Sequence, residues 1–493
     1  MRKKFAATLL VFLLILGIGS PIYAMPNEQH IAIQDFISEV QRVSRAPGIA
    51  ASAVIGEETY FFSTGLAHRR DGISINQGTL FELASVSKQF TALGILYLEE
   101  RGLLSLDDSI ADHLPWLTFR YNEQPVDMQD VRLYHFMHHT SGLPLVPKEG
   151  LGTLQSGVEA LIDSELLFFP GEQFEYGNGN YNILGLVIET VTGQSYESFM
   201  EGHIFRPLGM MQTFAYRENA VATGQFAQGY ATQFVFFTVP RNAQESQKTE
   251  NVPTGYLISS AQDMIRWMQV QLGLVTDIPE IFHTIIPRSH EQGRSVAIPE
   301  GFPFPVGSHY AGGWVLNAEQ YSVEHGGNNP SFSTYVLLLP DEQVGITILA
   351  NGCQVLDTNQ IAHSIADILQ GNLDVTYSMG GVQIQGIAFA LITVIGTLLA
   401  LVFFVFALGR IRKGDKRPLT KKRIALIALW AIVTLVMIVT LFVLPGLMGS
   451  GATWSLILSI VSLGALTWLI ALILLCASIT LFVAFVAFPQ RRK

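Results

Sequence analysis

The sequence of 493 residues contains little charge and almost no cysteine. Charged residues account for 14% of the chain and hydrophobic residues for 49%. This imbalance is too large for a chain that forms an ordinary soluble enzyme over its whole length. The two cysteines, Cys353 and Cys476, lie in regions of different character and are not expected to meet, so no disulfide framework supports the fold. We find no internal repeat and no low-complexity segment.

The shortage of charge is concentrated at the two ends of the chain. Residues 1–24 join three basic residues to an apolar run and end in small residues, which is typical of a secretory signal peptide cut after Ala24. Retention of this segment as an uncleaved anchor is the alternative. Residues 386–488 contain three apolar stretches without an ionisable side chain, each at least roughly 20 residues long. We therefore predict three transmembrane helices: Gly386–Leu408, Ile424–Leu444 and one within Ser455–Phe488.

The distribution of basic residues predicts how these spans are oriented. The loop 409–423 carries eight lysines and arginines against one aspartate, so it is expected to be cytoplasmic. The tail 489–493 is also basic. We expect a multi-pass protein of the cell membrane, with a catalytic domain at 25–375 on the extracytoplasmic side, a linker at 376–385 and a cytoplasmic C-terminus.

The predicted external domain is strongly acidic. Once the signal peptide, loop and tail are set aside, 16 basic and 39 acidic residues remain, a net charge of −23. Such a domain is not expected to bind nucleic acid. It would also be repelled by anionic lipid, so the spans rather than charge hold it at the bilayer, which is a predicted partner of the chain.

The order of the predicted elements indicates an α+β fold. A helix is expected at 30–43 and two strands within 49–69; three further strands are expected within 310–352, followed by a helix at 357–370. Between them lies a helix-rich region that extends to about residue 277. An antiparallel sheet flanked by helices, with a helical subdomain inserted into it, would place the site in the cleft between the two parts.

A serine and a lysine stand three residues apart at the start of an apolar, helix-period run, FELASVSKQFTALGILYLEE. Ser85 is expected in the first turn of this helix, where the i, i+3 spacing lets the Lys88 amine reach its hydroxyl. The positive helix end favours an alkoxide and a neighbouring oxyanion. This is the pattern of a serine nucleophile with a lysine base, which needs a dry pocket or a nearby cation to lower the pKa of Lys88.

Two later motifs occur in the order that such an enzyme would require. The segment FEYGNGN contains Tyr176 and Asn178, and VEHGGNNPSFST contains His325-Gly326-Gly327 followed by two asparagines. With these motifs the chain resembles the serine β-lactamase and penicillin-binding-protein superfamily, whose landmarks are S-x-x-K, then S-x-N or Y-x-N, then K-T-G or His-Gly-Gly.

The resemblance implies a role for each of these residues. Tyr176 would relay a proton to the leaving group, as a phenol held between two amines and driven partly to phenolate. Asn178 would orient the substrate or the lysine amine. Gly327 would let the substrate backbone approach, and the backbone N–H groups of Ser85 and Asn328 would form the oxyanion hole.

Where relatives have a lysine, this sequence has His325, which is a poor ligand for a substrate carboxylate at neutral pH. That puts β-lactam hydrolysis and DD-carboxypeptidase activity in doubt. Asn328 and Asn329 would hold a polar amide of the substrate, or only make the turn before Pro330. Glu82 would bind an ammonium or amide of the substrate, or instead neutralise the lysine or cap the helix.

Three histidines, His135, His138 and His139, superficially resemble metal ligands. They precede Thr140-Ser141-Gly142, a structural turn in the superfamily, and no carboxylate-rich motif accompanies them. We interpret them as structural and expect neither a metal nor another cofactor.

The whole chain, including the three predicted spans, resembles a narrower group: membrane-anchored peptidases that activate nonribosomal peptide prodrugs, of the colibactin-maturing type. The resemblance rests on FELASVSKQFTA, YHFMHHTSGLP, HGGNNPSFS and the anchor. It implies cleavage of an amide after an N-acylated D-asparagine, with an acylated peptide as substrate and with Glu82 and Asn329 reading the D-asparagine. One departure is Asn178, where that group has a serine.

Other interpretations stay open at this stage. A cell-wall D-amino-acid peptidase, a carboxypeptidase or an esterase of the same superfamily is the nearest alternative, and a non-catalytic sensor of peptidoglycan or β-lactam belongs to another class. A homodimer also stays open. Transport through the predicted spans is disfavoured, because they lack ionisable residues.

Overall fold

The computed structural model describes residues 25–145, 152–233, 237–241, 249–300, 302, 304–317, 319–353, 356–378 and 391. No helix within these residues is long and apolar enough to cross a membrane. The predicted signal peptide lies outside the described residues, and so do the predicted spans and basic loop, residue 391 excepted. The predicted linker is described only as far as residue 378.

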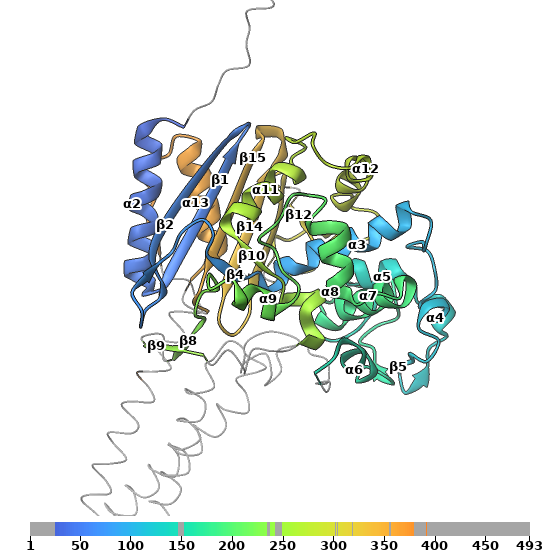
Figure 1. Ribbon diagram of the computed structural model, residues 1–493. Coiled ribbons are helices and arrows are strands. Elements are labelled where there is room, and N and C mark those ends of the chain that lie inside the picture. Colours follow the sequence, from blue (N-terminus) through green and yellow to red (C-terminus); the bar gives the residue numbers. More distant parts are fainter. Residues whose placement is uncertain are drawn as a thin grey trace, which may run out of the picture.

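Strands from both ends of the described domain form one eight-stranded antiparallel sheet (Figure 1). The N-terminal β1 pairs with the C-terminal β15 from Ile49–Ala350 to Ile55–Val344, which closes the domain on itself. In spatial order the strands are β11 (His309–Tyr310), β12 (Val315–Asn317), β13 (Ser322–Asn328), β14 (Ser333–Leu339), β15 (Val344–Ala350), β1 (Gly48–Ile55), β2 (Glu58–His68) and β3 (Ile73–Ser74).

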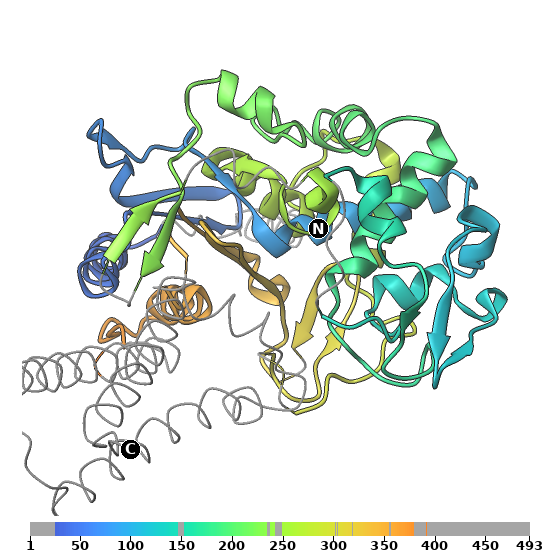
Figure 2. The same cartoon turned by 90° about the horizontal axis from the view of Figure 1, so that it is seen from below.

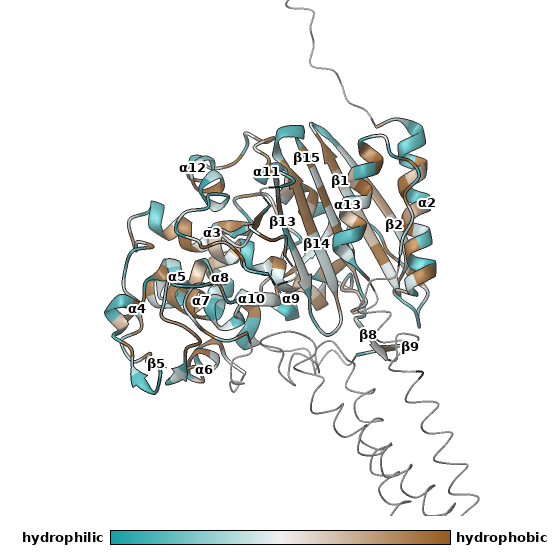
Figure 3. Ribbon diagram, turned by 180° about the vertical axis from the view of Figure 1, so that it is seen from behind, coloured by the Kyte–Doolittle hydropathy of each residue, from teal (hydrophilic) through white to brown (hydrophobic). Residues whose placement is uncertain are grey.

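Helices cover both faces of this sheet. On one face lie α2 (Asn27–Ser44) and α13 (Thr358–Leu369), and α11 (Ala261–Gln271) packs against β1 and β15 on the other (Figures 1 and 2). In α2 the buried Ile33, Phe36, Ile37 and Val40 recur at helical spacing, so a single apolar face meets the sheet. Because both faces are covered, β1 and β15 are buried almost throughout, as their hydropathy in Figure 3 indicates.

The middle of the chain forms the predicted helical subdomain beside the sheet. At its centre, α3 (Ser87–Glu100) is buried over most of its surface, as expected for a helix that is apolar on nearly every side. It packs against α7 (Asn178–Thr192), α10 (Val252–Gly255) and α12 (Glu280–Ser289). The other helices are α4 (Ile110–His113), α5 (Leu133–Met137), α6 (Leu154–Glu159), α8 (Tyr196–Phe199) and α9 (Arg217–Ala222).

Short strands form smaller sheets beside the main one. β4 (Leu80–Glu82) pairs with β10 (Ile258–Ser260) immediately before the nucleophile motif, and β8 (Tyr230–Gln233) pairs with β9 (Phe237–Pro240). The predicted α+β architecture is therefore confirmed. The prediction of three strands within 310–352 was wrong, because β11 and β12 are only two and three residues long and were not recognised.

Candidate active site

Ser85 lies in a 3₁₀ turn, Ala84–Val86, between β4 and α3. The sequence predicted it inside the helix; the structure places it just before the first turn, and Lys88 within that turn. Ala84 adopts a left-handed φ of 47°, a strained conformation for a residue other than glycine. Two neighbours hold the preceding Leu83: its N–H donates to Leu257 O at 2.8 Å, and its carbonyl accepts from Thr334 Oγ1 at 2.6 Å.

The Lys88 amine is completely buried and faces only neutral groups among the described residues. Its Nζ lies 3.3 Å from Ser85 Oγ, 3.0 Å from Asn178 Oδ1 and 2.8 Å from the carbonyl oxygen of Thr254. Burial removes the water that would stabilise an ammonium ion and lowers the pKa of Lys88 well below its ordinary value. The predicted dry pocket is therefore present.

These three contacts match the bonding capacity of a neutral amine. The Thr254 carbonyl can only accept, and Asn178 Oδ1 also accepts from Thr254 Oγ1 at 3.1 Å. The two N–H bonds of a neutral Lys88 are thus directed to Thr254 and Asn178, and its lone pair is left for the Ser85 hydroxyl proton. Asn178, at the first position of α7, orients the base, one of the two roles predicted for it.

Tyr176 faces the same centre from the helical subdomain. Lys88 Nζ lies 4.8 Å from the centroid of its ring, and the Tyr176 hydroxyl oxygen is shielded from solvent, with no hydrogen bond of standard geometry to any described residue. Burial raises the pKa of Tyr176 above its ordinary value, and the nearby Ser85 hydroxyl offsets this only in part. The predicted phenolate is therefore wrong: the phenol keeps its proton and is suited to donate it.

His325 is neutral and engaged on both ring nitrogens. Its Nδ1 lies 2.6 Å from the carbonyl oxygen of Gly326 and its Nε2 lies 2.9 Å from Tyr310 Oη. Burial and the nearby Lys88 lower the pKa of His325 to about 3. The side chain cannot supply a positive charge for a substrate carboxylate at neutral pH, as the sequence predicted.

The strand β13 presents an unpaired edge beside Ser85. β12 pairs with it only over Ser322–Glu324, so within the described residues the β12-side edge of His325–Asn328 has no partner strand and can accept an extended substrate. Gly327 is confined: a Cβ there would lie 2.4 Å from Thr334 Oγ1, 2.6 Å from Leu83 O and 2.9 Å from Ser85 N. The β13 backbone therefore lies close to the Ser85 N–H, and the contribution of the Asn328 N–H to an oxyanion hole stays a prediction.

The two asparagines after the glycines differ in their surroundings. Asn328 is exposed and its Oδ1 accepts from Ser333 Oγ at 2.7 Å. Asn329 is buried; its Oδ1 accepts from the backbone N–H groups of Ser331 and Phe332 at 2.9 and 2.8 Å. Asn329 therefore makes the turn, the alternative that the sequence had left open.

Glu82 forms a buried ion pair. Arg217 NH1 donates to its Oε1, and Asn329 Nδ2 donates to its Oε2 at 2.6 Å. Burial raises the pKa of Glu82 and the Arg217 charge opposes that rise. Glu82 lies on β4 and neither caps α3 nor contacts Lys88, so two of its predicted roles are wrong. Its carboxylate faces the buried side of the Asn329 turn.

The three predicted structural histidines all hold the chain together. His135 Nδ1 accepts from the backbone N–H of Arg132 at 3.0 Å, and His138 Nδ1 lies 2.8 Å from Tyr310 O. His139 Nδ1 accepts from the Gly177 N–H at 3.2 Å, and its ring lies 4.4 Å from that of Tyr176. Burial lowers the pKa of all three imidazoles, so they are neutral. His139 positions Tyr176 and Asn178 through the backbone between them.

Sequence reasoning missed three residues of this site. Arg217 was not recognised as the partner of Glu82, which lies 135 positions earlier. Thr254 contributes a backbone carbonyl, which no side-chain pattern can reveal. Tyr310 supports His325 from a two-residue strand. The aromatic content of YAGGW was the only available signal for Tyr310.

Together these groups can perform nucleophilic acyl transfer. Lys88 removes the Ser85 proton, the Ser85 N–H and the β13 edge stabilise the oxyanion, and Tyr176 donates a proton to the departing atom. The fold and this geometry define a serine hydrolase with a lysine base and a tyrosine acid.

Comparison with known proteins agrees with this class. The Beta-lactamase family model matches residues 33–370, and the chain belongs to that family. Protein flp of Staphylococcus aureus strain MW2 is 28% identical over 93% of this chain and 92% of its own. Penicillin-binding protein 4* of Bacillus subtilis strain 168 is 29% identical over 62% of this chain and 68% of its own.

Solved structures share the fold. The octameric penicillin-binding protein homologue from Pyrococcus abyssi has a TM-score of 0.61 and 24% identity, and covers 69% of this chain and 77% of its own. A class C β-lactamase has a TM-score of 0.60 and 19% identity, over 72% and 99% of the two chains. The similarity to protein flp covers too much of the chain to be confined to the described domain.

The close approach at Gly327 yields a test of the oxyanion hole. We expect Gly327→Ala to slow acylation of Ser85 by about 100-fold or more, because the added methyl group must push the β13 edge away from the Ser85 N–H. The rate is measured with a fluorophosphonate probe on the full chain in detergent. Gly202→Ala is the control, since a Cβ there meets nothing within 4 Å. Equal rates for the two variants would contradict this assignment.

Proposed function

We propose that this chain is an exported, membrane-anchored serine peptidase that cleaves the amide after an N-acylated D-asparagine and thereby releases an active compound from a nonribosomal peptide prodrug. The observation that carries the proposal is a complete acylation apparatus, Ser85, Lys88 and Tyr176, combined with a neutral His325. A leaving group that carries a free carboxylate would find no positive charge on His325 to bind it. A substrate cleaved at an internal amide has no carboxylate at that position and needs no such charge.

The bonds in the proposed reaction balance without a cofactor. Ser85 Oγ attacks the amide carbonyl carbon while its proton passes to Lys88. As the C–N bond breaks, Tyr176 gives its proton to the leaving nitrogen and recovers one from Lys88. Water then hydrolyses the ester to N-acyl-D-asparagine and restores the Ser85 hydroxyl.

We infer D-asparagine as the residue before the cleaved amide from the resemblance to prodrug-activating peptidases. The buried carboxamide of Asn329 and carboxylate of Glu82 lie next to the nucleophile motif, but they are bonded to one another. We therefore assign them an indirect part in recognition, as the support of the turn that borders the substrate.

A cell-wall D-amino-acid peptidase is the second candidate. Its support is the similarity to Penicillin-binding protein 4*, which extends over 62% of this chain. The neutral His325 weighs against a D-Ala-D-Ala carboxypeptidase, because such a substrate ends in a carboxylate. Homodimerisation stays a prediction, and the homologue described as octameric is consistent with self-association.

Hydrolysis of matched substrates separates the two candidates. We expect the wild-type chain to release p-nitroaniline from N-hexanoyl-D-asparagine p-nitroanilide at least about 100-fold faster than from the L-epimer, because inversion of the α carbon moves the side chain to the other side of a substrate extended along the β13 edge. Ser85→Ala should release none. Cleavage of a D-Ala-D-Ala peptide alone would reject the prodrug peptidase in favour of the cell-wall enzyme. Failure of the chain to cleave any substrate, with Ser85 unlabelled by a probe, would favour the sensor.

The proposed topology rests on the basic loop 409–423 and the acidic domain before it. In intact cells, a membrane-impermeant maleimide should label Glu57→Cys, on an exposed turn between β1 and β2, but label Lys413→Cys only after the membrane is opened. The wild-type chain is the control, because Cys353 is buried. Labelling of Lys413→Cys alone in intact cells would reverse the orientation.

A further inference from the structure

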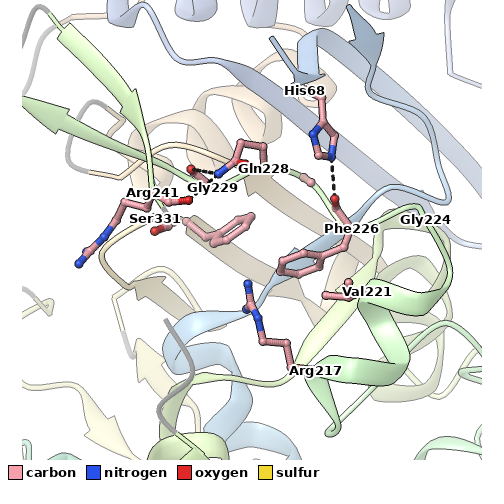
Figure 4. A pocket seen from close by; sticks show the side chains of 11 residues that line it. His68, Arg217, Val221, Gly224, Phe226, Gln228, Gly229, Arg241 and Ser331 are labelled. Atoms are coloured by element: carbon pink, nitrogen blue, oxygen red, sulfur yellow. Dashed lines mark hydrogen bonds between the residues drawn. The ribbon is translucent and has the colours of Figure 1, made fainter. Parts of the chain in front are cut away.

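A pocket of about 260 Å³ has Arg217, the ion-pair partner of Glu82, in its wall (Figure 4). It is formed by α9, the segment 224–229, the turn after β13, Arg241 just after β9 and His68 at the end of β2. The side chains that give it its character are His68, Arg217, Val221, Phe226, Arg241 and Phe332. None of these was singled out by the sequence, and the acylation steps do not use them.

Two phenyl rings form the body of the pocket. The ring centroids of Phe226 and Phe332 lie 5.8 Å apart, and Val221 adds an exposed apolar side chain beside them. The His68 imidazole is bonded through Nε2 to Phe226 O at 2.9 Å, so it fixes the wall. Such walls favour apolar groups, because each methylene that enters the pocket leaves water.

Two guanidinium groups line the pocket. Arg217 lies 4.5 Å above the centroid of the Phe226 ring and shares its charge with Glu82. Arg241 lines the same pocket, and its charge contributes to lowering the pKa of Glu82 against the effect of burial. The described residues give Arg241 no ion-pair partner, so its guanidinium can pair with an anionic group of a ligand.

The pocket borders the residues that precede the nucleophile, because its Arg217 pairs with Glu82. Phe332 follows the Asn329 turn and packs edge-on against Phe81, four residues before Ser85. Tyr176, the proton donor, lies on the helical side. In the tetrahedral intermediate the leaving nitrogen must face Tyr176 and the oxyanion must face the Ser85 N–H. The acyl-side substituent is then left for the side of Glu82 and Arg217, where the lining of the pocket begins.

We propose that this pocket binds the N-acyl group of the substrate and selects an acyl group with an apolar body and a terminal carboxylate. The phenyl rings contact the methylene chain, and Arg241 at the rim pairs with the terminal carboxylate. This inference rests on the proposed function, since it specifies the acyl part of the N-acyl-D-asparagine substrate.

Four substrates that differ only in the acyl group test it. These are the p-nitroanilides of D-asparagine carrying acetyl, hexanoyl, adipoyl and 6-aminohexanoyl groups. We expect kcat/KM for hexanoyl to exceed that for acetyl by about 10- to 100-fold, from burial of its methylenes. We expect adipoyl to exceed 6-aminohexanoyl by about 10-fold or more, and the difference to shrink in high salt.

Two variants test whether Phe226 causes the preference for hexanoyl and whether Arg241 causes the preference for adipoyl. Phe226→Ala should bring hexanoyl to within about twofold of acetyl, and Arg241→Gln should equalise adipoyl and 6-aminohexanoyl while the hexanoyl preference persists. Arg294→Gln is the matched control, because Arg294 is exposed and paired with the distant Asp107. Labelling of Ser85 by a fluorophosphonate verifies that every variant is folded.

The outcomes distinguish this inference from the proposed function. Equal cleavage of all four D-asparagine substrates by the wild-type chain would overturn the pocket assignment and leave the peptidase intact. Preferences that persist in both variants would overturn it as well. Cleavage of none of them, with Ser85 still labelled by the probe, would instead overturn the proposed D-asparagine specificity.

Discussion

The burial of a single amine at Lys88 is the constraint on which the rest of the site depends. An ammonium ion at this position would lose its hydration and, among the described residues, gain no carboxylate in exchange. The neutral amine is therefore the stable form, and its contacts with Asn178 and Thr254 leave its lone pair for Ser85. The same burial keeps the Tyr176 phenol protonated. Desolvation thus prepares a base and an acid a few ångströms apart.

The architecture supplies that dry centre from segments distant in sequence. α3 carries Lys88 through the middle of the helical subdomain, while β13, in the C-terminal half of the sheet, approaches Ser85 closely enough to require Gly327. The Glu82–Arg217 pair and the Asn329 turn join these parts beside the nucleophile. Because the pair is buried, loss of one partner would leave an uncompensated charge, at a cost of about 3–5 kcal/mol. Arg217 of this connection also lines the proposed acyl pocket.

The sequence predicted the residues whose chemistry depends on local spacing. Ser85 and Lys88 are three positions apart, so their contact follows from helical spacing. The amphipathic pattern of α2 and the alternating pattern of β1 and β2 could be recognised in the same way. It could not predict contacts set by tertiary packing, such as Arg217 on Glu82 or the Thr254 carbonyl on Lys88. It also assigned Tyr176 a phenolate, because the balance between burial and nearby charge is invisible in a linear pattern. The short strands β11 and β12 contain too few residues to show the alternation of apolar and polar side chains that predicts a strand.

Direct titration of Lys88 tests the central claim. The full chain, labelled with ¹³C at the lysine ε carbon and kept in detergent, is followed by NMR from pH 5 to pH 11, and the Lys88 signal is identified by its absence in Lys88→Met. The account predicts a neutral amine at pH 7.5, with protonation only as the pH falls through a pKa well below the ordinary lysine value of 10.5. An amine that stays protonated until about pH 10 would contradict it.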